Sequence, residues 1–140
     1  MSKKKIETSH LVNAPVEKVW ANISKASGVH EWLPMIETCS LEGQGEGAKR
    51  VCTTENGVLN ETILKIDHEN KTFQYAIDEQ TLFPISDIVG TMSVRNDKGK
   101  TILDWNLDFS LEDENIFSII EQAIAGMYAA GAAGLEKTSN

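Results

Sequence analysis

The sequence predicts an α+β domain in which one antiparallel sheet packs against a long C-terminal helix. Residues 35–111 contain six stretches of strand character with short turn signals between them. Consecutive strands joined by short turns pair antiparallel, because parallel pairing needs a long crossover. Residues 113–137 repeat apolar side chains at the three-and-four spacing of one helical face. A sheet with one apolar face needs a cover, and we expect this sheet to curl around that helix.

The first elements are a strand and two short helical segments. A strand pattern runs over Ile6–Asn13 and stops before Pro15. Pro15 is tolerated in the first turn of a helix, and Val16–Ile23 has the apolar spacing of a short amphipathic helix. Residues His30–Pro34 predict a second helical turn, which Pro34 ends.

Six further strands are expected after these helices. Their predicted ranges are Met35–Leu41, Lys49–Thr54, Leu59–Ile66, Thr72–Ile77, Asp87–Arg95 and Thr101–Leu111. The three glycines within Gly43–Gly47 resemble a phosphate loop, but a strand follows them, so they predict a hairpin turn. Asn56-Gly57 predicts a tight type I′ hairpin, because Asn and Gly accept positive φ.

The last strand alternates apolar and polar side chains, which predicts one buried and one wet face. Its apolar residues are Leu103, Trp105, Leu107, Phe109 and Leu111. We expect this face to pack on an apolar face of the long helix, formed by Ile116, Ile119, Ile120, Ala123, Ile124, Met127 and Gly131.

The second half of the long helix is unusually slim. Gly126, Ala130 and Gly134 are expected to face the sheet or a second subunit, because interior glycines weaken a helix unless something approaches closely. A homodimer is therefore possible. Residues 138–140 are expected to fray. The apolar stretch is long enough for a membrane span, but its Glu121 and its Ala and Gly content favour a core helix.

Composition indicates a soluble single domain over residues 1–140. The net charge of −8 disfavours nucleic acid and anionic membranes as partners. No cofactor motif or metal-ligand spacing is present, and no signal peptide follows the N-terminal lysines, so we expect a cytoplasmic protein. Cys39 and Cys52 lie nearly symmetrically about a predicted turn, where they could face each other across a strand pair. A cross-strand disulfide is the alternative, but in a reducing compartment two buried thiols are expected.

The order of elements, with particular residues in place, resembles the START-like, or helix-grip, superfamily, also called SRPBCC. This superfamily includes the polyketide cyclase/dehydrase and lipid-transport family, birch-pollen-type allergens and plant abscisic acid receptors. The resemblance is carried by Asn13–Trp20 (NAPVEKVW), Trp32–Pro34, the turn Gly47–Arg50, and Glu61 with the residues that follow it. It covers nearly the whole chain and implies a curved sheet of about seven strands around the long helix, with an internal cavity for an apolar or amphipathic molecule.

The resemblance and the strand alternation together predict the ligand-binding residues. These are Leu33, Met35, Ile36, Glu61, Ile63, Tyr75, Ile77, Leu82, Phe83, Ile88, Trp105, Phe109, Ile120, Ile124, Met127 and Tyr128. Glu61 matches a receptor glutamate that contacts ligand through water, although Leu64 and Ile66 favour the opposite strand phase. Tyr75 is expected either to contact the ligand or to be satisfied by the protein. Leu82 and Phe83 are expected to cover the cavity mouth.

One departure from the receptors bears on the ligand. The receptors carry a lysine that pairs with the hormone's carboxylate, and the matching position here is Leu33, or Pro34 if the register slips. The arginines Arg50 and Arg95 are expected near strand ends. A ligand carboxylate held by a buried cation is therefore not expected.

Three functions follow from this interpretation. The leading one is a carrier or sensor that binds a small lipid-, polyketide- or aromatic-like molecule in the cavity. The first alternative is a cyclase/dehydrase-like enzyme in which Glu61 and Tyr75 transfer protons. The second alternative is a protein-interaction module. The superfamily contains all three kinds, so the fold does not choose between them.

Overall fold

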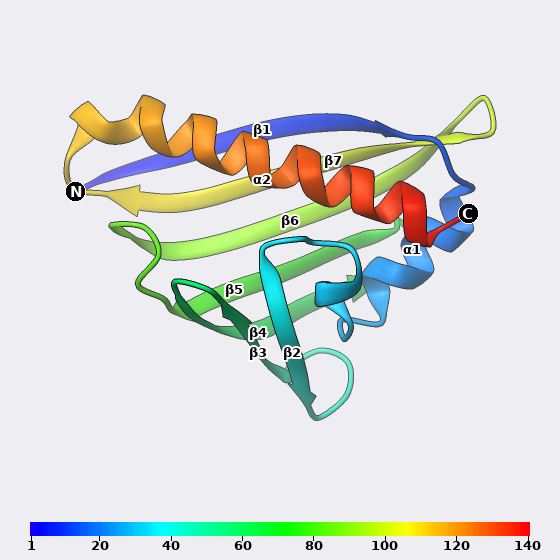
Figure 1. Cartoon of the computed structure of the whole chain (residues 1–140), viewed down its shortest axis with the longest axis horizontal. Coiled ribbons are helices and arrows are strands. Elements are labelled where there is room, and N and C mark those ends of the chain that lie inside the picture. Colours follow the sequence, from blue (N-terminus) through cyan, green and yellow to red (C-terminus); the bar gives the residue numbers. More distant parts are fainter.

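The computed structural model describes all 140 residues and consists of one curved sheet, a long helix and three shorter helical segments (Figure 1). The seven strands are antiparallel, in the order β1-β7-β6-β5-β4-β3-β2. The strands are β1 (Ser2–Val12), β2 (Ile36–Glu42), β3 (Lys49–Thr54), β4 (Gly57–Asp67), β5 (Thr72–Glu79), β6 (Ile85–Asp97) and β7 (Lys100–Leu111). The helical segments are α1 (Val16–Ser24), η1 (Val29–Glu31), η2 (Glu114–Ile116) and α2 (Phe117–Thr138).

This arrangement is the helix-grip fold, so the expected fold class is confirmed. Helix α2 runs along the sheet, and α1 and η1 close the end near the C-terminus (Figure 1). Every strand expected from the sequence is present. The largest difference is at β1, which begins at Ser2 because the three N-terminal lysines also pair with β7. The second short helix is a single 3₁₀ turn over Val29–Glu31.

The type I′ turn is not where the sequence predicted it. Thr54 pairs directly with Gly57, so the loop residues are Glu55 and Asn56. Asn56 does not have positive φ, and Gly57, at φ 158°, is already part of β4. Residues Lys98-Gly99 have φ of 54° and 86° and join β6 to β7 as a two-residue loop. Those angles are the pair that a type I′ turn requires.

The buried face of α2 is close to the predicted one but slightly rotated. Ile120, Ile124 and Tyr128 are buried against the sheet, whereas Ile119 is 67% exposed. Residues Glu114–Thr138 are long and apolar enough to cross a bilayer by length and composition, with a mean hydropathy of 1.3. In the fold, however, this stretch covers the concave face of the sheet (Figure 1).

The end of α2 is held by hydrogen bonds, so the expected fraying is wrong. Asn140 Nδ2 donates to the Asn13 carbonyl at 2.7 Å, and Asn13 N donates to Glu136 Oε1 at 2.7 Å. Ser139 is buried, and its hydroxyl accepts from Asn22 Nδ2 at 2.9 Å. These contacts join the C-terminus to the segment around α1.

The slim half of α2 lies close to η1 and β7, through Gly134, as predicted, and through Gly131 in place of Gly126 and Ala130. Ala130 and Gly126 face away from the sheet. A Cβ built on Gly131 would lie 2.8 Å from the Trp105 ring, and one on Gly134 would lie 1.8 Å from the Trp32 carbonyl oxygen. Gly131 and Gly134 are therefore the glycines that allow α2 to pack this closely, and this packing explains them without a second subunit.

Alanine substitutions at two glycines of α2 should have opposite effects. Gly134→Ala should lower the free energy of unfolding by about 1–3 kcal/mol, because the new methyl group meets the Trp32 backbone, which cannot rotate away. Gly126→Ala meets nothing within 4 Å and should raise it by up to about 1 kcal/mol through helix propensity. Urea unfolding of both variants measures the difference. Equal effects would mean that α2 does not approach η1 this closely.

Cys39 and Cys52 form a disulfide, which corrects the expectation of two free thiols. The two residues are direct partners in the β2–β3 register, with their Cα atoms 4.2 Å apart. Partners at this spacing point to the same face of a sheet. The sequence placed them on opposite sides of a turn, but their alignment depended on the register of the pair.

Candidate functional site

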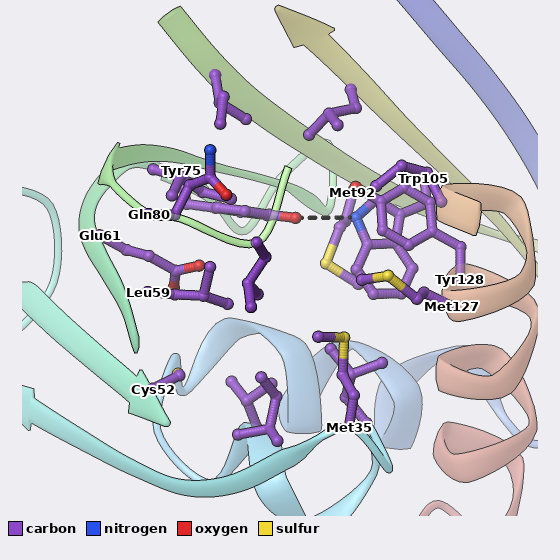
Figure 2. A pocket seen from close by; sticks show the side chains of 18 of the residues that line it. Met35, Cys52, Leu59, Glu61, Tyr75, Gln80, Met92, Trp105, Met127 and Tyr128 are labelled. Atoms are coloured by element: carbon purple, nitrogen blue, oxygen red, sulfur yellow. Dashed lines mark hydrogen bonds between the residues drawn. The ribbon is translucent and has the colours of Figure 1, made fainter. Parts of the chain in front are cut away.

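A cavity lies between the concave face of the sheet, α2 and η1. Hydrophobic residues make up 21 of the 24 residues that line it. Its volume is about 70 Å³, measured as the space open to the centre of a water-sized sphere. A single water needs about 10–15 Å³ on this measure, so the cavity has room for more than one water. Figure 2 shows Met35, Met92, Met127 and the rings of Tyr75, Trp105 and Tyr128 around it.

The structure places most of the predicted ligand-binding residues in the wall of this cavity. Those that line it are Leu33, Met35, Ile36, Glu61, Tyr75, Ile77, Leu82, Phe83, Ile88, Trp105, Ile124, Met127 and Tyr128. Three predicted residues are buried but lie outside the wall. Ile63 is next to the β2–β3 turn, where its backbone pairs with Gly47 and Ala48, and Phe109 packs on Phe117 near the start of α2. Ile120 also belongs to the core near that end of α2.

A β-bulge decides the orientation of Glu61. The register of β4 with β5 shifts between Ile63 and Lys65, and an extra residue in one strand reverses the alternation beyond it. Glu61 and Ile63 therefore point to the concave face, while Leu64 is 41% exposed. Ile66, on the far side of the bulge, again packs on the core. The sequence pattern of β4 was ambiguous because the side chains before and after the bulge alternate in opposite phase.

Arg50 lies near the start of β3, as expected, but it is buried there beside Glu61. Its Nε donates to Glu61 Oε1 at 2.5 Å, and its Nη1 donates to the Ala26 carbonyl at 2.9 Å. The exposed fractions of the Arg50 and Glu61 side chains are 6% and 5%. The guanidinium also lies 5.5 Å from the Phe73 ring centre and 5.3 Å from that of Tyr75. Desolvation raises the pKa of Glu61, and the Arg50 charge opposes this rise without cancelling it.

Three aromatic side chains form the wall next to this ion pair. Trp105 Nε1 donates to the Tyr75 hydroxyl at 3.1 Å, the contact marked in Figure 2. Trp105 and Tyr128 stack with ring centres 3.8 Å apart. Burial raises the pKa of both tyrosine hydroxyls, with a further rise for Tyr75 from the Glu61 charge. Both hydroxyls therefore remain protonated, and Tyr75 is satisfied by the protein, as one of the two sequence interpretations proposed.

Gly90 provides the space for the Tyr75 ring. The two residues are cross-strand partners in β5 and β6. A Cβ on Gly90 would lie 2.3 Å from Tyr75 Cζ, so the ring lies flat across the place where a side chain would be. An aromatic ring that covers a cross-strand glycine supports the sheet at a weak position. Here it also directs the hydroxyl toward Trp105.

Trp32 contributes an unpaired donor to the cavity wall. Its indole Nε1 is the only buried side-chain nitrogen or oxygen of the protein without a hydrogen-bond partner. Trp32 is 5% exposed, and its ring centre lies 5.8 Å from that of Trp105. An unmade buried hydrogen bond costs about 1–3 kcal/mol, which native structures rarely tolerate without a reason.

The β5–β6 loop, which the sequence predicted to cover the cavity mouth, contributes to the cavity wall. Leu82 and Phe83 line the cavity together with Met35 and Met127. The Gln80 side chain shapes the loop, because its Nε2 donates to the Phe83 carbonyl at 2.9 Å and its Oε1 accepts from Phe83 N at 2.9 Å. Flexible methionines at an entrance can adapt to different shapes.

Sequence reasoning missed three wall residues with polar groups, Arg50, Gln80 and Trp32. Arg50 is the second residue of β3, where an arginine ordinarily reaches solvent. Its position opposite Glu61 in the β3–β4 register was the available signal, since the short hairpin aligns the two residues. For Trp32 no such signal existed, because the absence of a partner depends on every neighbouring element.

Comparison with known proteins supports this assignment of the fold. One similar solved structure is the major latex-like protein 151 of Panax ginseng, with 17% sequence identity and a TM-score of 0.82 over 99% of this chain and 98% of that one. XoxI from Bacillus cereus has 20% identity and a TM-score of 0.81 over 99% of this chain and 96% of that one. A protein from Thermobifida fusca has 24% identity and a TM-score of 0.80 over 94% of this chain and 90% of that one. No curated protein matches the sequence. The model of one family, described as polyketide cyclase / dehydrase and lipid transport, matches residues 3–140. The chain therefore belongs to the polyketide cyclase/dehydrase and lipid-transport family.

Proposed function

We propose that the protein binds a small apolar or amphipathic molecule in the cavity between the sheet and α2, and acts as a carrier or sensor of that molecule. The observation that supports this most directly is the wall itself, with hydrophobic residues at 21 of its 24 positions and a few polar groups among them. Apolar surface supplies affinity in such sites, and the polar groups fix orientation.

The size of the cavity sets the kind of ligand that fits. The cavity volume of about 70 Å³, which is the space open to the centre of a water-sized sphere, suits a ligand with one or two rings or a short alkyl chain. A longer lipid would require Leu82, Phe83 and the methionines at the mouth to move outward. These residues belong to a loop and to flexible side chains, which are the parts of a binding site that usually adjust.

Filling the cavity tests the proposal. Ile124→Trp places a larger side chain in the cavity wall and should strongly weaken binding of the neutral fluorescent probe N-phenyl-1-naphthylamine. We expect the Kd of the probe to rise at least tenfold, which corresponds to a loss of about 1.4 kcal/mol of binding free energy. Fluorescence titration of the purified protein measures this, with circular dichroism to show that the variant is folded.

Ile119→Trp is the matched control, because Ile119 lies on the same helix but is 67% exposed. Its probe affinity should equal that of the parent protein. If the folded Ile124→Trp variant took up the probe as well as the parent does, the cavity would not be the binding site. A role as a protein-interaction module would then be the better proposal.

The enzymatic alternative has less support from the geometry. Arg50 holds Glu61 Oε1 and Trp105 donates to the Tyr75 hydroxyl, so both proposed proton-transfer groups already have partners in the protein, and of the Glu61 carboxylate only Oε2 is open. A general acid or base must reach the proton that it moves. We therefore favour binding over the cyclase/dehydrase-like reaction as the function of this cavity.

A further inference from the structure

The few polar groups in the cavity wall constrain the charge of the ligand. The Arg50 guanidinium is the one cationic group among the 24 lining residues. It is already occupied by Glu61 and by the Ala26 carbonyl, at 2.5 and 2.9 Å. Because Glu61 neutralises it inside the protein, an entering anion would meet a pair with no net charge. The cavity thus lacks the unpaired cation that a buried carboxylate needs.

Glu61 itself presents an acceptor. Its Oε1 faces Arg50, whereas its Oε2 receives no hydrogen bond from the protein. The carboxylate lies at the cavity wall beside Leu59 and Tyr75 (Figure 2). A ligand N–H or O–H would satisfy this oxygen, and a ligand carboxylate would be repelled by it.

Trp32 lines the same cavity, and its indole nitrogen is buried within the wall. Its buried Nε1–H has no acceptor in the protein. The Trp105 indole already donates to the Tyr75 hydroxyl, and the Tyr128 ring stacks on Trp105. A carbonyl oxygen on the ligand would supply the acceptor that the Trp32 indole lacks.

The charged residues at the surface around the cavity mouth also disfavour an anionic ligand. The hollow next to Leu82 and Phe83 is lined by Glu37 and Glu55 and contains no lysine or arginine. The whole chain has a net charge of −8. A negative entrance lowers the local concentration of anions and leaves neutral molecules unaffected.

We propose that the cavity selects an uncharged, mostly apolar molecule that carries both a carbonyl-type acceptor and an N–H or O–H donor, such as a carboxamide, over a carboxylate of the same shape. The donor of the ligand pairs with Glu61 and its carbonyl with Trp32. This inference rests on the binding function proposed above and specifies the chemical class of its ligand.

The experiment compares two isosteric compounds on the full chain. 2-Naphthamide and 2-naphthoate have the same ring system and differ in charge and in the amide donor. Each is titrated against protein loaded with N-phenyl-1-naphthylamine, at neutral pH and low ionic strength. We expect the amide to displace the probe with a Kd at least about tenfold below that of the acid, since burying an unpaired carboxylate is costly.

Two variants assign this preference to the named residues. Glu61→Gln leaves the Arg50 charge unneutralised, so it should strengthen 2-naphthoate binding at least about tenfold. Trp32→Phe removes the indole N–H and keeps an apolar ring. It should weaken 2-naphthamide several-fold and leave unsubstituted naphthalene unchanged, since naphthalene has no acceptor. Thermal melts establish that both variants are folded.

The outcomes are distinct. If the parent protein takes up the probe but binds 2-naphthoate as tightly as 2-naphthamide, the selectivity is overturned and the binding function stands. If the parent takes up neither the probe nor the two naphthalene compounds, the binding function and the selectivity both fail. The comparison on the parent protein decides the matter even if a variant does not fold.

Discussion

Replacing Trp105 with alanine is expected to lower the free energy of unfolding by about 3–5 kcal/mol, the usual loss for a large buried aromatic side chain. Trp105 is 2% exposed and lies between the sheet and α2. Its ring stacks on Tyr128, and its Nε1 donates to the Tyr75 hydroxyl. Alanine would remove these contacts together and leave a void next to the existing cavity, where no neighbouring side chain can fill the space without losing its own packing.

Urea denaturation of the parent protein and of Trp105→Ala measures the effect. Ile119→Ala is the control on the helix that Trp105 supports, because Ile119 is 67% exposed and should change stability by less than about 0.5 kcal/mol. A loss below about 1 kcal/mol for Trp105→Ala would show that this ring does not join the sheet to the helix.

Arg50→Met is expected to have an effect of similar size for a different reason. Removing one partner of a buried ion pair typically costs about 3–5 kcal/mol, because the other charge is left buried and unpaired. Here that charge is Glu61, whose side chain is 5% exposed. The matched control is Arg95→Met. The Arg95 side chain is 65% exposed, and its pair with Asp104 at 3.6 Å should contribute at most about 1 kcal/mol.

The loss in Arg50→Met should depend on pH with a defined sign. Burial already raises the pKa of Glu61 above its ordinary value of 4.5, and Arg50 opposes that rise. Without Arg50 the pKa rises further. A carboxyl with a raised pKa in the folded state holds its proton more tightly than in the unfolded chain, so its favourable contribution is present at low pH. That contribution is lost as pH rises through the folded-state pKa.

Unfolding curves at about pH 5 and about pH 8 test this dependence. Arg50→Met should be destabilised more at the higher pH. Adding Glu61→Leu to the variant should recover most of the loss at the higher pH, since two apolar residues leave no unpaired charge. A loss that did not change with pH and was not recovered in the double variant would show that Glu61 is not buried as a charged group.

The sequence alone determined the class and order of the fold. Alternation in β7 and the three-and-four spacing of α2 are local properties, because the side-chain period of a strand or helix does not depend on its neighbours. The short turns impose antiparallel pairing, because two parallel strands need a long crossover connection. With the resemblance, these patterns also located much of the cavity wall, including Tyr75, Ile124 and the two loop residues Leu82 and Phe83.

Only the tertiary structure decided the polar chemistry of the site. Whether Glu61 faces the cavity depends on a bulge in β4, and the position of that bulge follows from the pairing with β5. The cysteine pairing likewise depends on the register of β2 with β3. Arg50 is buried because Ala26, Glu61 and two rings, from separate parts of the chain, surround it. The missing partner of Trp32 depends on all the elements around the cavity at once. Charge pairing and hydrogen-bond satisfaction are relations between distant residues, so they exist only once the chain has folded and excluded water.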